Sequence, residues 1–289
     1  MLRPSPHHDL LVTTDFTLEG VHFRREWHSP ESVGHRCVAR GLSDIAAMGG
    51  LPTAVFLSLA LPAGLPQSWV KRFILGLTRL ARKHGAALSG GDTTQSPHGI
   101  LADIIVVGAV PAGEAILRSG ARVGHRIFVT GELGGSAAAV LEMQKRPNTK
   151  LNQNQYRRHF YPDPRVEVGQ FLRKRGLASA MIDSSDGLST DLSHICEESG
   201  VGAEFHAEQI PRARLGKSRR EVSLELALHG GEDYELLFTV PKSVHLPEKI
   251  QGVTITEIGR TVSRRGLFLR TGEKTEKLRP RGWEYFRKP

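Results

Sequence analysis

The sequence predicts an α/β protein of two domains with mixed sheets. Apolar runs that suit buried strands alternate with amphipathic helical patterns along most of the 289 residues. The length suits one large domain or two ordinary ones. Because Pro111–Gly113 combines turn residues directly after an apolar run, we expect residues 1–111 to form the first domain and residues 112–289 the second.

The first half begins with a short β-rich run and continues with a capped helix. Ser29 and Pro30 suit the cap and first position of a helix that ends at Met48. A second helix over Pro66–His84 has apolar residues at three- and four-residue steps. The remaining apolar runs predict strands over Leu10–Thr14, Thr53–Leu61, Ala86–Ser89 and Ile100–Val110.

The second half repeats the alternation. Its apolar runs predict strands over Arg126–Thr130, Ala178–Ile182 and Tyr234–Val240, and its periodic segments predict helices over Ala137–Gln144, Pro164–Arg175 and Leu188–Glu198. Residues 145–160 are polar and irregular, which predicts a flexible loop.

Composition excludes several classes of protein. The hydrophobic fraction of 39% argues against disorder, and no apolar run is long enough to span a bilayer. Two cysteines without close spacing favour a reducing, cytoplasmic location. The net charge of +9 comes from two blocks of +7, residues 144–176 and 260–289, around a block of −7 at residues 177–259. We therefore expect neither a nucleic-acid nor a membrane partner.

Acidic residues gather where predicted strands end, beside glycine or hydroxyl residues. Such oxygen ligands suit Mg²⁺, and adjacent glycines allow the backbone to approach phosphate. Asp44 differs, because it interrupts an apolar helix where an unpaired charge is expensive to bury. The acidic segments are Thr13-Thr14-Asp15, Gly90-Gly91-Asp92-Thr93-Thr94, Asp183-Ser184-Ser185-Asp186-Gly187 and Gly230-Gly231-Glu232-Asp233.

Each of these acids also has a structural interpretation as a turn residue or helix cap. The turn at Gly131–Ser136 resembles an anion-binding helix start, and Arg118 suits either a phosphate contact or the surface. No P-loop, dinucleotide fingerprint or zinc-helix motif is present in the sequence. The residues alone therefore favour Mg²⁺-dependent phosphoryl transfer without a P-loop.

Taken in order, the segments resemble the thiamine-monophosphate kinase family, within the superfamily of aminoimidazole ribonucleotide synthetase. The resemblance spans residues 13–286. It includes Glu19-Gly20-Val21-His22-Phe23, Leu42–Gly49, Arg118-Ser119-Gly120-Ala121-Arg122 and Gly282-Trp283-Glu284-Tyr285-Phe286 beside the acidic segments above. It implies a two-domain aminoimidazole ribonucleotide synthetase-like fold that forms a homodimer, whose N-terminal strands build a shared barrel.

The resemblance also implies ATP-dependent phosphorylation of thiamine monophosphate to thiamine diphosphate, by direct in-line transfer without a covalent nucleophile. By the same resemblance, several Mg²⁺ ions would be bound by Thr13, Thr14, Asp15, Asp44, Asp92, Asp183 and Asp186. ATP would contact Gly91, Arg118 and Ser185, and the substrate would contact His22, Glu232 and Trp283.

The family also carries an N-terminal Gly-rich and acidic segment that this sequence lacks, so we expect the chain as written to be weakly active or inactive. Two alternatives stay open: another ATP-dependent enzyme of the superfamily, and a catalytically impaired homologue that binds nucleotide. A panel of acceptor substrates separates the first alternative, and nucleotide binding without ADP release would indicate the second.

Overall fold

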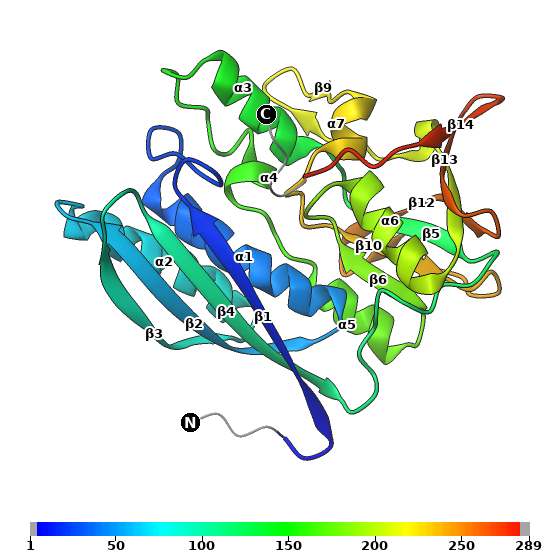
Figure 1. Cartoon of the computed structure of the whole chain (residues 1–289), viewed down its shortest axis with the longest axis horizontal. Helices are drawn as coiled ribbons and strands as arrows, with labels where there is room; N and C mark the ends of the chain where they lie inside the picture. Colours follow the sequence, from blue (N-terminus) through cyan, green and yellow to red (C-terminus); the bar gives the residue numbers. More distant parts are fainter. Residues whose placement is uncertain (1–4, 284–289) are drawn as a thin grey trace.

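The computed structural model describes residues 5–283 and contains two main sheets, which lie beside each other (Figure 1). The first has four strands in the order β1-β4-β2-β3. Its pairs are antiparallel except for the parallel pair β2–β3. The strands are β1 (His8–Leu18), β2 (Leu51–Pro62), β3 (Ala87–Ser96) and β4 (Leu101–Pro111).

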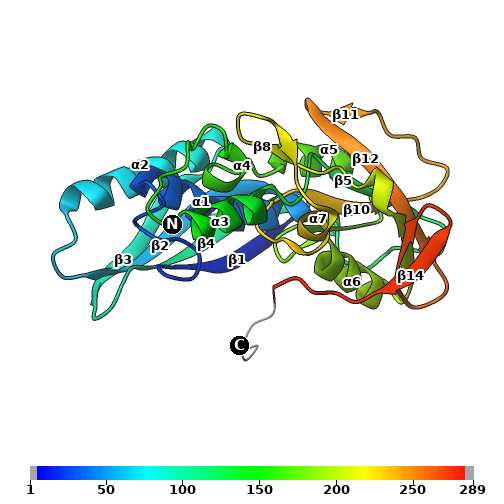
Figure 2. The ribbon, with the colours of Figure 1, turned by 90° about the horizontal axis from the view of Figure 1, so that it is seen from above.

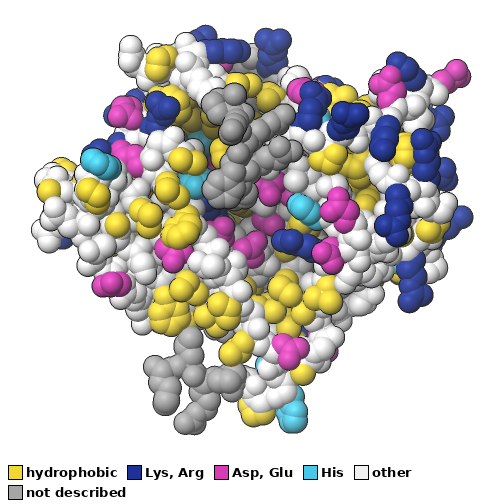
Figure 3. Space-filling model, in the orientation of Figure 1, with side chains coloured by type: hydrophobic (Ala, Val, Ile, Leu, Met, Phe, Trp, Pro, Cys, Tyr) yellow, Lys and Arg dark blue, Asp and Glu magenta, His cyan; other side chains and the backbone are white. Residues whose placement is uncertain are grey.

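Two helices, α1 (Pro30–Ala47) and α2 (Gln67–Lys83), cover one face of this sheet, as Figure 2 shows. The opposite face carries exposed apolar side chains, including Leu10, Val12, Phe16 and Leu51. Hydrophobic side chains are visible over this region in Figure 3. Exposed apolar surface of this kind is typical of an interaction face.

The second main sheet has the order β14-β13-β7-β12-β5-β10-β6, with β11 paired to β12. It is mixed, because β13 and β7 are parallel whereas the other pairs are antiparallel. Its strands are β5 (Arg126–Thr130), β6 (Ala180–Asp183), β7 (Gly202–His206), β10 (Leu236–Val240), β11 (Lys249–Ile250), β12 (Val253–Val262), β13 (Gly266–Thr271) and β14 (Lys274–Leu278).

The remaining elements accompany this second sheet. The short strands β8 (Arg214–Leu215) and β9 (Arg220–Glu221) form a separate pair. The helices are α3 (Gly135–Lys145), α4 (Arg157–Phe160), α5 (Val166–Lys174), α6 (Leu188–Ser199) and α7 (Leu224–His229), with a 3-10 turn at Ala207–Gln209. Among residues 5–283, no helix is long and apolar enough to cross a membrane.

The predicted α/β fold with mixed sheets is confirmed, with differences at the ends of elements. β1 and β3 run further than predicted, because their polar and glycine residues continue the extended backbone beyond the apolar run. The stretch 145–160, expected to be a loop, ends in the short helix α4. The prediction contained no strand after Val240, where β12, β13 and β14 lie.

Helix α1 is central to the core. Leu42, Ile45 and Cys37 are almost fully buried, and the helix contacts β1, β4, α2, α5 and β6. One apolar cluster therefore contains side chains from both main sheets. As a consequence, polar residues on α1 have fixed positions relative to β6 and the turn that follows it.

Candidate active site

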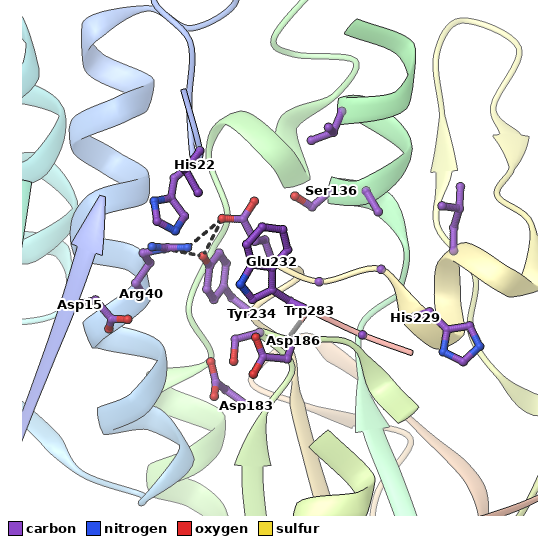
Figure 4. A pocket seen from close by; sticks show the side chains of 18 of the residues that line it. Asp15, His22, Arg40, Ser136, Asp183, Asp186, His229, Glu232, Tyr234 and Trp283 are labelled. Carbon is purple, nitrogen blue, oxygen red and sulfur yellow. Dashed lines mark hydrogen bonds and ion pairs between the residues drawn. The ribbon is translucent and has the colours of Figure 1, made fainter. Parts of the chain in front are cut away.

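A cavity of about 750 Å³ opens beside the N-terminal sheet, between β1, α1, α3 and the turn after β6. Its other walls come from α7, from residues 230–234 and from the C-terminal residues 281–283. Of the residues predicted for the site, it is lined by Thr14, Asp15, His22, Asp44, Asp183, Ser185, Asp186, Glu232 and Trp283. Figure 4 shows seven of these side chains, which come from distant parts of the sequence.

Asp15, Asp44 and Asp183 form the acidic side of the cavity, with Asp186 after them on the turn. Asp183 accepts a hydrogen bond from Ser43 at 2.7 Å, and Asp44 accepts one from Thr13. Burial and the charge of Asp44 raise the pKa of Asp15 to about 7 and that of Asp183 to about 8. These carboxylates therefore repel one another, and a cation placed between them would relieve the repulsion.

The donors are of the type that Mg²⁺ prefers, carboxylate and hydroxyl oxygens. Within residues 5–283, however, no three His, Cys, Asp or Glu side chains stand close enough to enclose a metal ion by themselves. The hydroxyl of Ser184, on the same turn, is buried without a hydrogen-bond partner in the described part of the chain. The set fits ions that complete their coordination with phosphate and water oxygens.

Two arginines on α1 hold the opposite side of the cavity. Arg36 contacts Glu232 at 2.7 Å and Arg40 contacts it at 3.0 Å, while Arg40 also donates to the Tyr234 hydroxyl at 3.0 Å. Figure 4 shows the contacts of Arg40 as dashed lines. Burial alone would raise the pKa of Glu232, but the two guanidinium charges lower it well below its ordinary value. Glu232 is therefore ionised and fixed in position.

His22 presents a single hydrogen-bond donor to the cavity. Its Nδ1 accepts from the backbone N–H of Leu18 at 2.9 Å, so the proton of the neutral ring is on Nε2. Burial and the charge of Arg40 lower the pKa of His22 to about 4. At neutral pH the ring is uncharged and suits an acceptor such as a phosphate oxygen.

A second layer of histidines supports Arg36. Arg36 donates to the backbone carbonyl of His159, and the Nε2 atoms of His159 and His28 lie 2.9 Å apart. Burial and Arg36 lower the pKa of both rings, that of His28 to about 4. Because both rings are neutral, one can donate to the other. The Nδ1 of His159 also contacts the Ser136 hydroxyl at the cavity floor at 2.9 Å.

The loop over residues 230–235 connects these layers. Glu232 and Tyr234 have φ angles of 66° and 54°, which are uncommon for residues with side chains. Asp233 points the other way and accepts from the backbone N–H groups of Gly134 and Ser136 at 2.5 and 3.1 Å. The anion at the start of α3, where the sequence resembled an anion-binding turn, is thus the protein's own Asp233.

Four predicted residues do not line the cavity. Thr13 lies behind Asp44, to which its hydroxyl donates. Arg118 is exposed, but its charge lowers the pKa values of Asp44, Asp183 and Asp186 against the effect of burial. The other two, Gly91 and Asp92, lie on the edge strand β3, on the far side of the sheet from β1.

Gly91 has a packing reason to be glycine. A Cβ atom at this position would lie 1.8 Å from the carbonyl oxygen of Leu57 on the neighbouring strand. The parallel pairing of β2 and β3 therefore requires glycine here. The predicted ligand roles of Thr13, Gly91, Asp92 and Arg118 stay predictions.

Sequence reasoning missed Arg36, Arg40 and Tyr234. Arg36, Arg40 and Asp44 recur at four-residue steps, so they lie along one face of α1. Charges at this spacing on an otherwise apolar helix are a signal that could have identified them. Their partner Glu232 lies 192 residues beyond Arg40, so the ion pair itself has no local signal.

Comparison with known proteins gives family matches to both parts of the chain. The family of AIR synthase related protein matches with its N-terminal domain at residues 1–111 and its C-terminal domain at residues 122–272. The chain is 37% identical over 283 residues to the thiamine-monophosphate kinase of Aquifex aeolicus, covering 96% of this chain and 88% of that protein. It is 35% identical over 297 residues to the Bacillus subtilis enzyme, with the same coverage.

Solved structures agree with these matches. AaThiL complexed with AMPPCP and TMP has a TM-score of 0.85 and 34% identity, covering 98% of this chain and 89% of that chain. Thiamine-monophosphate kinase from Stenotrophomonas maltophilia has a TM-score of 0.83 and 34% identity, covering 93% and 87%. The hydrogenase maturation protein HypE in complex with ATP shares the fold at 17% identity and a TM-score of 0.78, covering 97% and 87%.

Replacing Glu232 by Gln tests the ion pairs across the cavity. The change leaves two guanidinium groups, one of them almost fully buried, without a counter-charge. We expect the free energy of unfolding in urea to fall by about 3 kcal/mol. Glu257→Gln, which alters an exposed ion pair with Arg126, is the matched control and should cost less than about 1 kcal/mol. Equal effects of the two changes would contradict this assignment.

The pH dependence of stability tests the crowding of the carboxylates in metal-free protein. A raised folded-state pKa means that stability is greatest when the group is protonated and is lost as pH rises through that pKa. Because Asp15 and Asp183 have pKa values of about 7 and 8, we expect the free energy of unfolding to fall between pH 6.5 and 8.

The buried histidines act in the opposite direction, because their pKa values are lowered from 6.5 to about 4 in His22, His28 and His35. Their contribution is complete above pH 6.5. Asp183→Asn should therefore flatten the slope between pH 6.5 and 8, whereas Asp92→Asn on the exposed edge strand should leave it unchanged. A slope that Asp183→Asn does not alter would rule out this origin.

Proposed function

Because the chain belongs to the thiamine-monophosphate kinase family, we propose that it transfers the γ-phosphoryl group of ATP to thiamine monophosphate, forming thiamine diphosphate. The observation that carries the proposal is the convergence on one cavity of Asp15, Asp44 and Asp183 with His22, Glu232 and Trp283. ATP is the co-substrate. The solved relative binds AMPPCP and TMP, which matches this pair of ligands.

We infer that Asp15, Asp44, Asp183 and Asp186 hold several Mg²⁺ ions, with the hydroxyl of Thr14 beside them and Thr13 orienting Asp44. Bound Mg²⁺ would neutralise the charge of the phosphate chain and orient it for transfer. The raised pKa values of Asp15 and Asp183 support this inference, because such carboxylates gain most from a cation. Arg118 and Ser185 are proposed to contact the nucleotide.

The chain's own residues are proposed to bind and orient the acceptor. The Nε2–H of His22 would donate to the phosphate of thiamine monophosphate, and the Trp283 ring would stack on the cationic thiazolium. Glu232, ionised by its arginines, would add negative charge near that cation. His22 has its other nitrogen bound to the backbone, and Cys37 and Cys196 are buried. These features support direct in-line transfer without a covalent intermediate.

We propose that two chains pair through the open face of the N-terminal sheet, as in the barrel expected for the family. On this face the register aligns Asp103 with Ser58 and Ser58 with Asp92. A polar row therefore crosses an otherwise apolar surface, and Asp103 binds the Thr14 hydroxyl at 2.7 Å. A second copy facing this row would bring Gly91 and Asp92 of one protomer toward the cavity of its partner.

Three other expectations remain proposals. The division at residue 111/112 is supported by the separate four-stranded sheet of residues 8–111. A cytoplasmic location is supported by the two unpaired cysteines. The alternatives of another superfamily activity, or of an impaired homologue that binds nucleotide without turnover, are outcomes of the assay below.

The activity is tested by supplying Mg²⁺ and ATP with a panel of acceptors and measuring both ADP and the phosphorylated product. We expect thiamine diphosphate only with thiamine monophosphate. Asp44→Asn should lower kcat at least about 100-fold, because a buried charge that faces the phosphates is lost. Asp163→Asn, in the exposed ion pair with Lys83, is the control. Nucleotide binding without ADP release would contradict the proposal.

Complementation between inactive variants tests the shared site. Asp92→Asn and Asp44→Asn chains should each be nearly inactive alone. If Asp92 acts in the partner's site, a mixed dimer contains one intact site, so refolding an equal mixture should restore roughly a quarter of full activity. If Asp92 acts within its own chain, both sites of the mixed dimer are defective. Activity that stays at the level of the single variants would then exclude sharing.

A further inference from the structure

Residues Arg281–Trp283, which we term the strap, run from the end of β14 to the cavity and lie against the start of α6. Three successive backbone N–H groups of the strap donate to this region. Arg281 donates to the Ser189 hydroxyl at 3.4 Å, Gly282 to the Thr190 hydroxyl at 3.1 Å, and Trp283 to the carbonyl of Asp186 at 3.0 Å. The strap is therefore bound directly to the turn that carries a proposed metal ligand.

Side chains tie the strap to α7 as well. The Arg281 guanidinium contacts Glu225 at 3.0 Å and the Nε2 of His229 at 3.1 Å. Since arginine can only donate, Nε2 is the acceptor, and the proton of His229 is on Nδ1, 2.8 Å from the Ser189 hydroxyl. His229 thus connects α7, the strap and α6 through one ring.

Gly282 allows the strap to lie flat on the turn. A Cβ atom at this position would lie 2.1 Å from the carbonyl oxygen of Asp186 and 2.5 Å from the Thr190 hydroxyl. Neither distance is compatible with a side chain at residue 282. Any side chain here would therefore move the strap, the turn or both.

The same turn is held from its other side by the loop over residues 230–235. Glu232 N–H donates to the carbonyl of Ser185 at 2.8 Å, and Tyr234 N–H donates to that of Ser184 at 2.9 Å. The turn that carries Asp186 therefore lies between the loop that carries Glu232 and the strap that carries Trp283. A shift of the strap is transmitted to Asp186 through main-chain bonds rather than through solvent.

We propose that the strap couples the acceptor side of the cavity to the Mg²⁺-nucleotide side, with Gly282 and His229 as positioning residues. This inference rests on the proposed function, which places the acceptor beside Trp283 and Mg²⁺ at Asp186. The Trp283 ring and the Asp186 turn act as one unit, because the Trp283 main chain is bonded to Asp186. Displacing the strap weakens both binding sites, whereas removing only the indole ring weakens one.

The test compares Gly282→Ala with Trp283→Ala by calorimetric titration, using Mg²⁺ with the non-hydrolysable analogue AMPPCP and, separately, thiamine monophosphate. Gly282→Ala should weaken both affinities about tenfold. Trp283→Ala keeps the main-chain bonds, so it should weaken only thiamine monophosphate and change the nucleotide affinity less than about twofold. Arg279→Ala, exposed and just before the strap, is the control and should change neither affinity.

Loss of acceptor affinity alone in Gly282→Ala would overturn the coupling and leave the strap as a simple wall. A lower melting temperature with both affinities unchanged would overturn it too. Should Gly282→Ala fail to fold, Thr190→Val removes a single bond to the strap and should weaken both affinities about threefold. The nucleotide titration does not depend on turnover. Failure of the proposed activity is therefore seen separately, as absence of thiamine diphosphate in the wild-type assay.

Discussion

The contact of Glu232 with Arg36 and Arg40 is the interaction on which the site depends. It joins α1 of the N-terminal sheet to the loop before β10 in the second sheet. Apolar packing brings these parts together but has little directional preference, whereas a buried carboxylate between two guanidinium groups fixes distance and orientation. The cavity between the two sheets owes its shape to this contact.

The acidic side of the cavity follows the opposite principle. Asp15, Asp44 and Asp183 are brought together without enough compensating positive charge, and their raised pKa values record the cost. The arginines that could compensate are committed to Glu232, or stand outside the cavity as Arg118 does. Folding energy is thus given up on one side of the cavity, where an incoming cation restores it, and is secured on the other.

The sequence predicted the alternation of strands and helices and most acids of the site, because strand ends and an isolated Asp in an apolar helix have local signals. The strands after Val240 were missed, since many side chains of β12 and β14 are exposed and polar. The pairing of Arg40 with Glu232 depends on residues 192 positions apart, which no local pattern records. The place of Asp92 depends on strand order, and its distance from β1 could not be predicted from spacing.

The strand order also affects how the chain is made. β1 pairs only with β4, and Leu18 is aligned with Leu101. At about 5–20 residues per second, a ribosome needs roughly 4–17 seconds to synthesise the residues between them. During that interval the nascent β1, with Leu10, Val12 and Phe16 alternating along it, has no strand partner. The first strand to be synthesised is therefore among the last that can join its sheet, and this interval is when the nascent chain is most exposed to aggregation.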